Sequence, residues 1–175
     1  TPVTQECMVH VANQLQLPVL MLYGVLYQEA GTPGRISRNS NGTYDIGPMQ
    51  INSIHLPFFK GSYGLTEAQL RNNGCLNVWA GGVLLWLHLQ SAGGDHWKAV
   101  GNYHSKTKIH HDKYKYAVAS KVQGWMERAK RGMLGVSGTK PSKQATATVE
   151  SPVSAPAEPA VQPESQPASV TYRRY

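Results

Sequence analysis

Residues 76–89 read Leu-Asn-Val-Trp-Ala-Gly-Gly-Val-Leu-Leu-Trp-Leu-His-Leu, a strongly apolar stretch of helical length. Its large apolar residues are distributed too widely to occupy only one side of a helix. A helix that is apolar all round has to be buried, so this stretch predicts the central helix of a helical domain.

The sequence on both sides of this stretch predicts further helices. Cys7, Val11 and Leu15 recur at spacings of four, which places them on one helical face. Pro18 can open a second helix that runs to Glu29, before a segment rich in glycine and proline ends it. A short helix from residue 67, with Thr66 as its N-cap, and helices over residues 96–103 and 112–131 complete the set.

A small irregular region separates the second predicted helix from the third. Residues 38–45 read Arg-Asn-Ser-Asn-Gly-Thr-Tyr-Asp, and Asn41-Gly42 is a typical hairpin turn. The chain shows no internal repeat and no βαβ alternation. The predicted fold class is therefore mainly α, with one small β-turn region.

The composition changes sharply between residues 132 and 143. Residues 144–170 are dominated by Pro, Ala, Ser, Val and Glu and contain no aromatic residue, so they cannot bury enough apolar area to offset their chain entropy. We therefore expect a folded domain over residues 1–136 and a disordered, extended tail over residues 137–175. The tail ends in Tyr-Arg-Arg-Tyr at 172–175, and either a linker remnant, slightly favoured, or a docking tail fits this composition.

The chain is basic, with 17 Lys and Arg against 10 Asp and Glu among its 175 residues. This balance favours a polyanionic partner, but the basic residues from 98 to 131 form no nucleic-acid motif, so we expect no nucleic acid. A solvated basic face is the default interpretation of these residues, and attraction to an anionic polymer is the functional alternative. The apolar run Leu17–Leu26 is too short to span a membrane. Since Thr1 starts directly with polar residues, we expect a cytoplasmic protein or an exported one whose leader has been removed.

Cysteine and histidine spacing limits the possible cofactors. Cys7 and Cys75 lie too far apart for a CxxC motif, which leaves a disulfide or two buried thiols open. His110 and His111 are adjacent and cannot share a helical face, and no HExxH pattern occurs. The sequence therefore predicts no metal site and no cofactor.

Glu29 is the candidate for acid–base chemistry. Burial at the end of an apolar helix would raise the pKa of its carboxyl group, as proton donation to a glycosidic oxygen requires. By position alone, a surface glutamate is the commoner outcome. Residues 45–52 follow as Asp-Ile-Gly-Pro-Met-Gln-Ile-Asn, in which Met49 offers a soft apolar surface and Gln50 and Asn52 offer amides to sugar hydroxyl and acetamido groups.

These segments together resemble the soluble lytic transglycosylase family. The resemblance rests on Gln28-Glu29-Ala30, Ile36-Ser37, residues 45–52, and Ala-Val-Gly-Asn-Tyr-His-Ser at 99–105. Residues 77–82 resemble the stretch that leads into the family's central helix. The match covers residues 5–128 in the family's order, is closest to the small branch associated with type IV secretion and conjugation, and implies a lysozyme-like, mainly α-helical fold.

The resemblance implies a role for each matched residue. Glu29 matches the catalytic acid and base, Ser37 a serine near the substrate acetamido group, and Tyr103 a tyrosine that helps to position the carboxylate. Met49, Gln50 and Asn52 are expected to line the substrate groove. Because the loop between Ser37 and Gly47 is longer than in the large family members, Tyr44 or Asp45 are alternative groove residues. The chain also departs from the family at Ala30, usually serine, and at Pro48, usually leucine.

The same resemblance implies a periplasmic enzyme that needs no cofactor. It would cleave the MurNAc–GlcNAc β-1,4 bond of peptidoglycan with formation of 1,6-anhydroMurNAc and would open the wall for a secretion or conjugation apparatus. If the tail is a docking segment, its extended character and its basic and aromatic end suit it to recruiting components of this apparatus. It also implies a disulfide between Cys7 and Cys75. Two other functions stay open: a hydrolytic lysozyme (muramidase), and a wall-binding assembly factor in which catalysis is dispensable.

Overall fold

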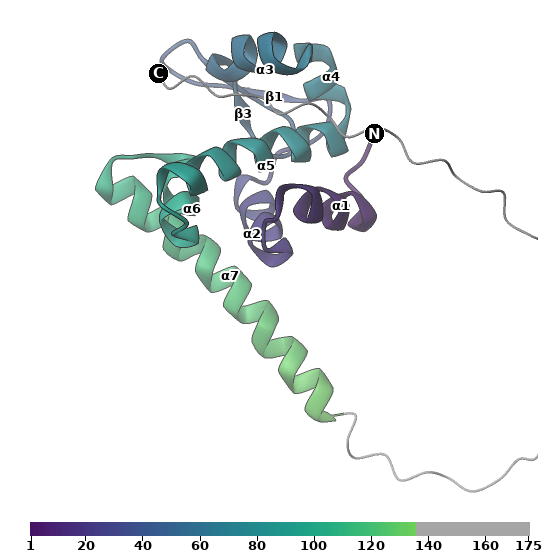
Figure 1. Ribbon diagram of the computed structural model, residues 1–175, viewed down its shortest axis with the longest axis vertical. Helices are drawn as coiled ribbons and strands as arrows, with labels where there is room; N and C mark the ends of the chain where they lie inside the picture. Colours follow the sequence, from purple (N-terminus) through teal and green to yellow (C-terminus); the bar gives the residue numbers. More distant parts are fainter. Residues whose placement is uncertain (136–175) are drawn as a thin grey trace, which may run out of the picture. The chain divides into compact units, whose positions relative to one another are not determined.

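The structure, a computed structural model, describes residues 1–135 (Figure 1). The predicted tail over residues 137–175 lies outside the described residues. The elements are, in chain order, α1 (Gln5–Leu15), α2 (Val19–Glu29), β1 (Ile36–Arg38), β2 (Tyr44–Ile46), β3 (Ile51–Asn52), the 3-10 helix η1 (Ser53–His55), α3 (Leu56–Tyr63), α4 (Glu67–Asn72), α5 (Gly74–Ser91), α6 (His96–His104) and α7 (Lys108–Gly135). No helix among these residues combines the length and the apolar character needed to cross a membrane.

Helix α5 forms the centre of the domain, as its apolar sequence predicts. It packs against α1, α4, α6 and β3. Figure 1 shows the sheet, α3 and α4 on one side of α5, and α1, α2 and α6 on the other. Asn73 caps the helix by accepting a hydrogen bond from the backbone N–H of Leu76, so the helix starts two residues before the predicted stretch.

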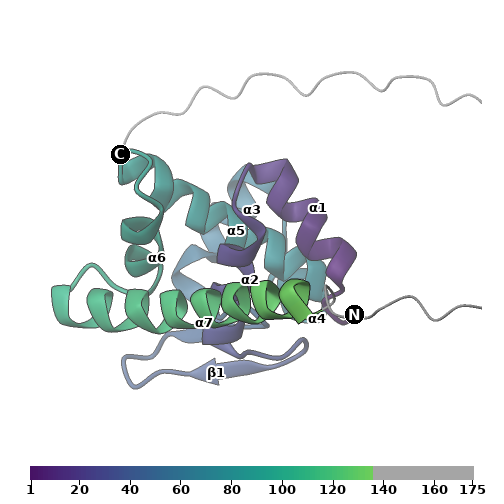
Figure 2. The same cartoon turned by 90° about the horizontal axis from the view of Figure 1, so that it is seen from below.

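Both predicted N-terminal helices are present, and the second has the predicted ends. The side chain of Thr4 caps α1 by accepting from the N–H of Cys7, and Cys7 forms a disulfide with Cys75 at the start of α5. The pairing that the family resemblance implies is therefore confirmed. Helix α2 follows Pro18 and ends at Glu29, and it lies alongside α7 (Figure 2). Gly24 permits this close packing, because a Cβ atom there would lie 2.8 Å from Cγ1 of Val118.

The predicted turn at Asn41-Gly42 joins β1 and β2 in an antiparallel hairpin, to which β3 adds a third strand. The register pairs Ile36 with Ile46 and Ile46 with Ile51, and Ile46 and Ile51 are buried in the core. The next row across the sheet is Ser37, Asp45 and Asn52, which lies on the opposite face because side chains alternate along a strand.

Two elements differ from the sequence prediction. Helix α3 is not predicted, since its eight residues, Leu-Pro-Phe-Phe-Lys-Gly-Ser-Tyr, contain a proline and a glycine and are too short for a clear helical period. Helix α7 starts four residues before the predicted Asp112 and extends beyond Arg131. Its added first turn contains the ion pair between Lys108 and Asp112, an i,i+4 contact that favours helix.

Candidate active site

Glu29 lies half-buried at the last residue of α2, where it meets α7. The hydroxyl of Tyr114 on α7 donates a hydrogen bond to Oε1 of Glu29 at 2.5 Å. Burial raises the pKa of Glu29 to about 7, the hydrogen bond from Tyr114 opposes this rise, and the charge of Asp45 adds to it. The predicted effect of burial on this carboxyl group is confirmed, so Glu29 can be either protonated or ionised near neutral pH.

The side chain of Glu29 lines a hollow of about 260 Å³ between α2, α7 and the end of α6. The hollow is lined by Gln28, Glu29, His104, His110, Lys113, Tyr114 and Ala117. A larger and more apolar hollow of about 500 Å³ lies between the start of the chain and the outer face of α2, and Glu29 does not line it. We assign the site to the smaller hollow, because only this one contains a carboxyl group that can exchange a proton at neutral pH.

The polar row on the sheet is formed by Ser37, Asp45 and Asn52, and its middle residue, Asp45, interacts with Glu29. The carboxylate of Asp45 accepts hydrogen bonds from Nδ2 of Asn39 at 3.0 Å and from Nδ2 of Asn52 at 2.8 Å. Burial raises the pKa of both Glu29 and Tyr103, and the charge of Asp45 adds to each rise, so the carboxylate of Asp45 lies near these two groups. The sheet therefore brings together three of the residues that the sequence nominates, and Ser37 remains exposed there.

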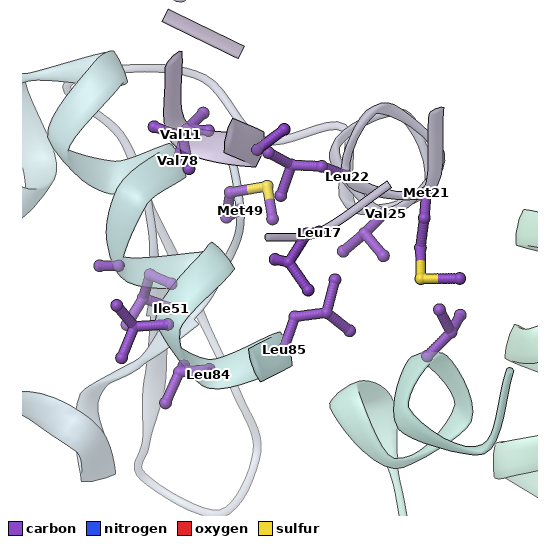
Figure 3. Packing of buried hydrophobic residues seen from close by; sticks show 14 of the residues in the cluster. Val11, Leu17, Met21, Leu22, Val25, Met49, Ile51, Val78, Leu84 and Leu85 are labelled. Carbon is purple, nitrogen blue, oxygen red and sulfur yellow. The ribbon is translucent and has the colours of Figure 1, made fainter. Parts of the chain in front are cut away.

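Met49 does not line the groove, and the prediction that its side chain offers a substrate surface is wrong. The side chain is fully buried (Figure 3) and packs on Gly81 of α5, where a Cβ atom would lie 2.7 Å from it. The backbone of Met49 instead fixes the segment: its N–H donates to Oδ1 of Asn77 at 2.7 Å, and its carbonyl accepts from the hydroxyl of Tyr103 at 2.8 Å.

Tyr103 and Tyr44 each donate a hydrogen bond to another part of the protein. Tyr103 bonds to the Met49 carbonyl, so the direct hydrogen bond that holds Glu29 comes from Tyr114 and not from Tyr103. The hydroxyl of Tyr44 donates to Oε2 of Glu67 at 2.7 Å and is thus directed to α4.

Gln50 keeps a position suited to substrate contact. It is half-buried, and its backbone is left-handed with a φ of 49°. Its Nε2 donates to the carbonyl of Gly47 at 2.9 Å, which leaves Oε1 without a hydrogen bond among the residues that the structure describes. A Cβ atom on Gly31 would lie only 2.0 Å from the Gly47 carbonyl oxygen, so Gly31 has to be glycine for this turn to pack beside the end of α2.

Sequence reasoning missed Tyr114. The residue shares one buried face of α7 with Val118 and Val122, at spacings of four. A hydroxyl group on such an otherwise apolar face needs a buried hydrogen-bond partner, and this requirement is the feature that could have identified it.

The adjacent histidines point to different neighbours, as expected. His110 lines the Glu29 hollow, whereas the ring of His111 packs on Gly101 of α6. His104, also in the hollow, stacks on Tyr114 with ring centroids 4.8 Å apart and planes within 2°. Within residues 1–135, no three His, Cys, Asp or Glu side chains are grouped so that they could hold a metal ion.

The model of the transglycosylase SLT domain family matches residues 6–125, which is more than half of the chain. The chain belongs to this family. Among its relatives, invasion protein IagB of Salmonella typhimurium (strain LT2) is 30% identical over 118 residues, which cover 67% of this chain and 72% of the relative. Protein IpgF of Shigella flexneri is 30% identical over 115 residues, covering 64% and 74%. A peptidoglycan-binding-like protein of Escherichia coli O157:H7 is 31% identical over 90 residues, covering 50% and 53%.

Membership of the SLT family indicates a class of reaction. At the level of the family it implies lytic transglycosylase activity on peptidoglycan, outside the cytoplasm. In this SLT domain, the carboxyl group of Glu29 at the end of α2 lines the hollow and has a pKa raised to about 7.

Proposed function

We propose that this SLT domain cleaves the MurNAc–GlcNAc β-1,4 bond of peptidoglycan with formation of 1,6-anhydroMurNAc, and that Glu29 is both acid and base. One observation carries the proposal: a carboxyl group with a pKa of about 7 lines an open hollow and is oriented by Tyr114. A general acid is most effective when its pKa lies near the working pH.

The proposed reaction has two proton transfers at the same carboxyl group. In the first step, Glu29 gives its proton to the glycosidic oxygen as the bond from that oxygen to C1 of the muramic acid breaks. The substrate's acetamido oxygen stabilises the positive charge that develops at C1. In the second step, the C6 hydroxyl oxygen attacks C1 and its proton returns to Glu29. The product is an anhydro sugar, and no water is consumed.

A hydrolytic lysozyme is the second candidate, and Asp45 is the observation that favours it. Paired carboxylates are common in glycosidases, and the charge of Asp45 acts on Glu29. However, both oxygens of Asp45 accept hydrogen bonds from asparagine amides, and this satisfied arrangement supports a structural role in the polar row. The two candidates differ in their products: hydrolysis leaves reducing muramic acid ends, and the proposed reaction leaves anhydro ends.

The first prediction concerns Glu29→Gln. We expect cleavage of purified sacculi to fall by about 10²–10⁴-fold, because the amide cannot transfer the proton, while binding to sacculi is retained. The exposed Glu127 on α7 supplies the matched control, since Glu127→Gln leaves the hollow unchanged. Mass spectrometry of the muropeptides released by the parent protein should find anhydroMurNAc ends.

Three outcomes would contradict parts of this proposal. Unchanged cleavage by Glu29→Gln would exclude Glu29 as the acid and base. Reducing ends without anhydro sugar would replace the transglycosylase with a lysozyme. Binding without any cleavage by the parent protein would favour the wall-binding assembly factor.

The proposal extends to the cellular role. The similarity to a protein named for invasion supports local opening of the cell wall for an envelope-spanning secretion or conjugation apparatus, in the periplasm. The predicted tail over residues 137–175 would then serve as the segment that recruits components of this apparatus.

A further inference from the structure

Three basic side chains surround the hollow in front of Glu29. His104 comes from the end of α6, and His110 and Lys113 come from the first two turns of α7. We name these three residues the basic rim. Among residues 1–135, Glu29 is the only acidic residue that lines the hollow, and its raised pKa keeps a large fraction of it uncharged at neutral pH.

The side chains of the basic rim are exposed, and none of them forms an ion pair with an acidic side chain among residues 1–135. Lys108 and Lys115, on other sides of α7, both pair with Asp112. By contrast, neither His110 nor Lys113 forms an ion pair or a side-chain hydrogen bond within the described part of the chain, residues 1–135. Their side-chain nitrogen atoms are therefore available to a ligand in the hollow.

The rim is also held close to the reacting carboxyl group. The ring of His104 lies flat on Tyr114, whose hydroxyl binds Glu29. Desolvation, and then the nearby charge of His110, lower the pKa of His104, so the two imidazoles are neighbours. A ligand that reaches Glu29 thus lies beside the rim.

We propose that the basic rim binds a carboxylate carried by the muramic acid at the cleaved bond, and so determines which glycan the enzyme accepts. This inference rests on the proposed function. The ammonium group of Lys113 donates charge-assisted hydrogen bonds, and the imidazole N–H groups of the two histidines donate hydrogen bonds beside it. A carboxylate accepts all of these, whereas a neutral sugar hydroxyl matches the charged donor poorly. In peptidoglycan this carboxylate is either the free lactyl group of a strand without peptides or an acid group of the stem peptide. A strand of neutral N-acetylglucosamine alone offers neither.

Binding to the inactive Glu29→Gln full-length chain tests the rim separately from catalysis. The probes are a disaccharide-tetrapeptide muropeptide with free carboxylates, the same muropeptide with its carboxylates amidated by methylamine, and the peptide-free disaccharide with its lactyl carboxylate. NMR titration should give about tenfold tighter binding of a free acid than of its amidated form, the usual size of a charge-assisted hydrogen bond. The probe whose carboxylate is bound, peptide-free or peptide-bearing, identifies the source.

Lys113→Gln in the same background should bring the affinity ratio between free and amidated muropeptide close to one. Lys106→Gln is the matched control, because Lys106 is equally basic and exposed, lies in the loop after α6, and does not line the Glu29 hollow. It should leave the ratio unchanged.

Equal affinities for free and amidated probes, or a ratio that Lys113→Gln does not alter, would overturn the inference and show the rim to be a solvated surface. Failure of the active protein to form anhydro ends would instead contradict the proposed function, and the binding ratio would then still report on the rim alone.

Discussion

Glu29 is held between two opposed influences on its pKa, of which burial is the larger. Burial raises the pKa of its carboxyl group, whereas the hydrogen bond from Tyr114 stabilises the charged form and lowers the pKa. The resulting value of about 7 lets one group give and then take a proton. Tyr114 therefore affects both the orientation of Glu29 and its protonated fraction.

Tyr114→Phe should separate these two effects. Loss of the hydrogen bond raises the pKa of Glu29 above its present value, so the alkaline limb of the pH–rate profile should move to higher pH. The phenylalanine ring keeps the stacking on His104, but the carboxyl group loses its orienting partner, and we expect the maximal rate to fall about tenfold. The control is Tyr116→Phe, because Tyr116 lies on the same helix and is 67% exposed. An alkaline limb that stays in place, or moves to lower pH, would contradict this account of Glu29.

The sequence nominated Glu29 as the acid but did not indicate its surroundings. Glu29 was nominated because it ends an apolar helix and precedes a recognisable motif, and its raised pKa agrees with the predicted effect of burial. The role of Met49 was not, because an amino-acid sequence does not show whether a methionine points into the core or into a groove. Tyr114 follows Glu29 by 85 residues, and only the packing of α7 on α2 brings the two together.

At the scale of elements, α5 and the segment over residues 47–50 fix each other. The buried side chain of Asn77 accepts from the N–H of Met49 and donates to the carbonyls of Ile46 at 2.9 Å and Leu70 at 3.0 Å. Gly47, with a φ of 67°, lies so close that a Cβ atom would be 2.5 Å from Nδ2 of Asn77. One amide thus joins β2, the motif segment and α4 to the central helix. The helices were predictable from local periodicity, but this junction was not, since its partners lie up to 31 residues apart.

Asn77→Ala should therefore destabilise the domain strongly. The substitution leaves one buried N–H and two buried carbonyls without their partner, and we expect the free energy of unfolding to fall by about 3 kcal/mol or more. Urea unfolding followed by circular dichroism measures this change. Asn13→Ala, on the exposed side of α1, is the control and should change stability by less than about 0.5 kcal/mol. Similar stabilities for the two variants would show that the Asn77 junction contributes little.

At the scale of the whole domain, the site combines two parts of the chain. The disulfide between Cys7 and Cys75 closes a loop that contains Glu29, the sheet and the motif segment. Helices α6 and α7, which supply Tyr114 and the basic rim, lie outside this loop and complete the site by packing on α5 and α2. Spacing alone left the cysteines either paired or free, because the fold, and not the sequence separation, places their Cα atoms 5.7 Å apart.

The double variant Cys7→Ser, Cys75→Ser tests how far this closed loop stabilises the domain. A cross-link over 68 residues restricts the unfolded chain, so its loss should lower the free energy of unfolding by about 4 kcal/mol. Urea unfolding measures the difference, and the parent protein in reductant should approach the variant. Reductant should not affect the variant itself, which serves as the control.

Because no residue of the site contacts the disulfide through a hydrogen bond or ring contact within residues 1–135, the folded variant should still cleave sacculi at a rate within about twofold of the parent. Equal stability of parent and variant would mean that the packing of α1 on α5 alone holds the loop closed.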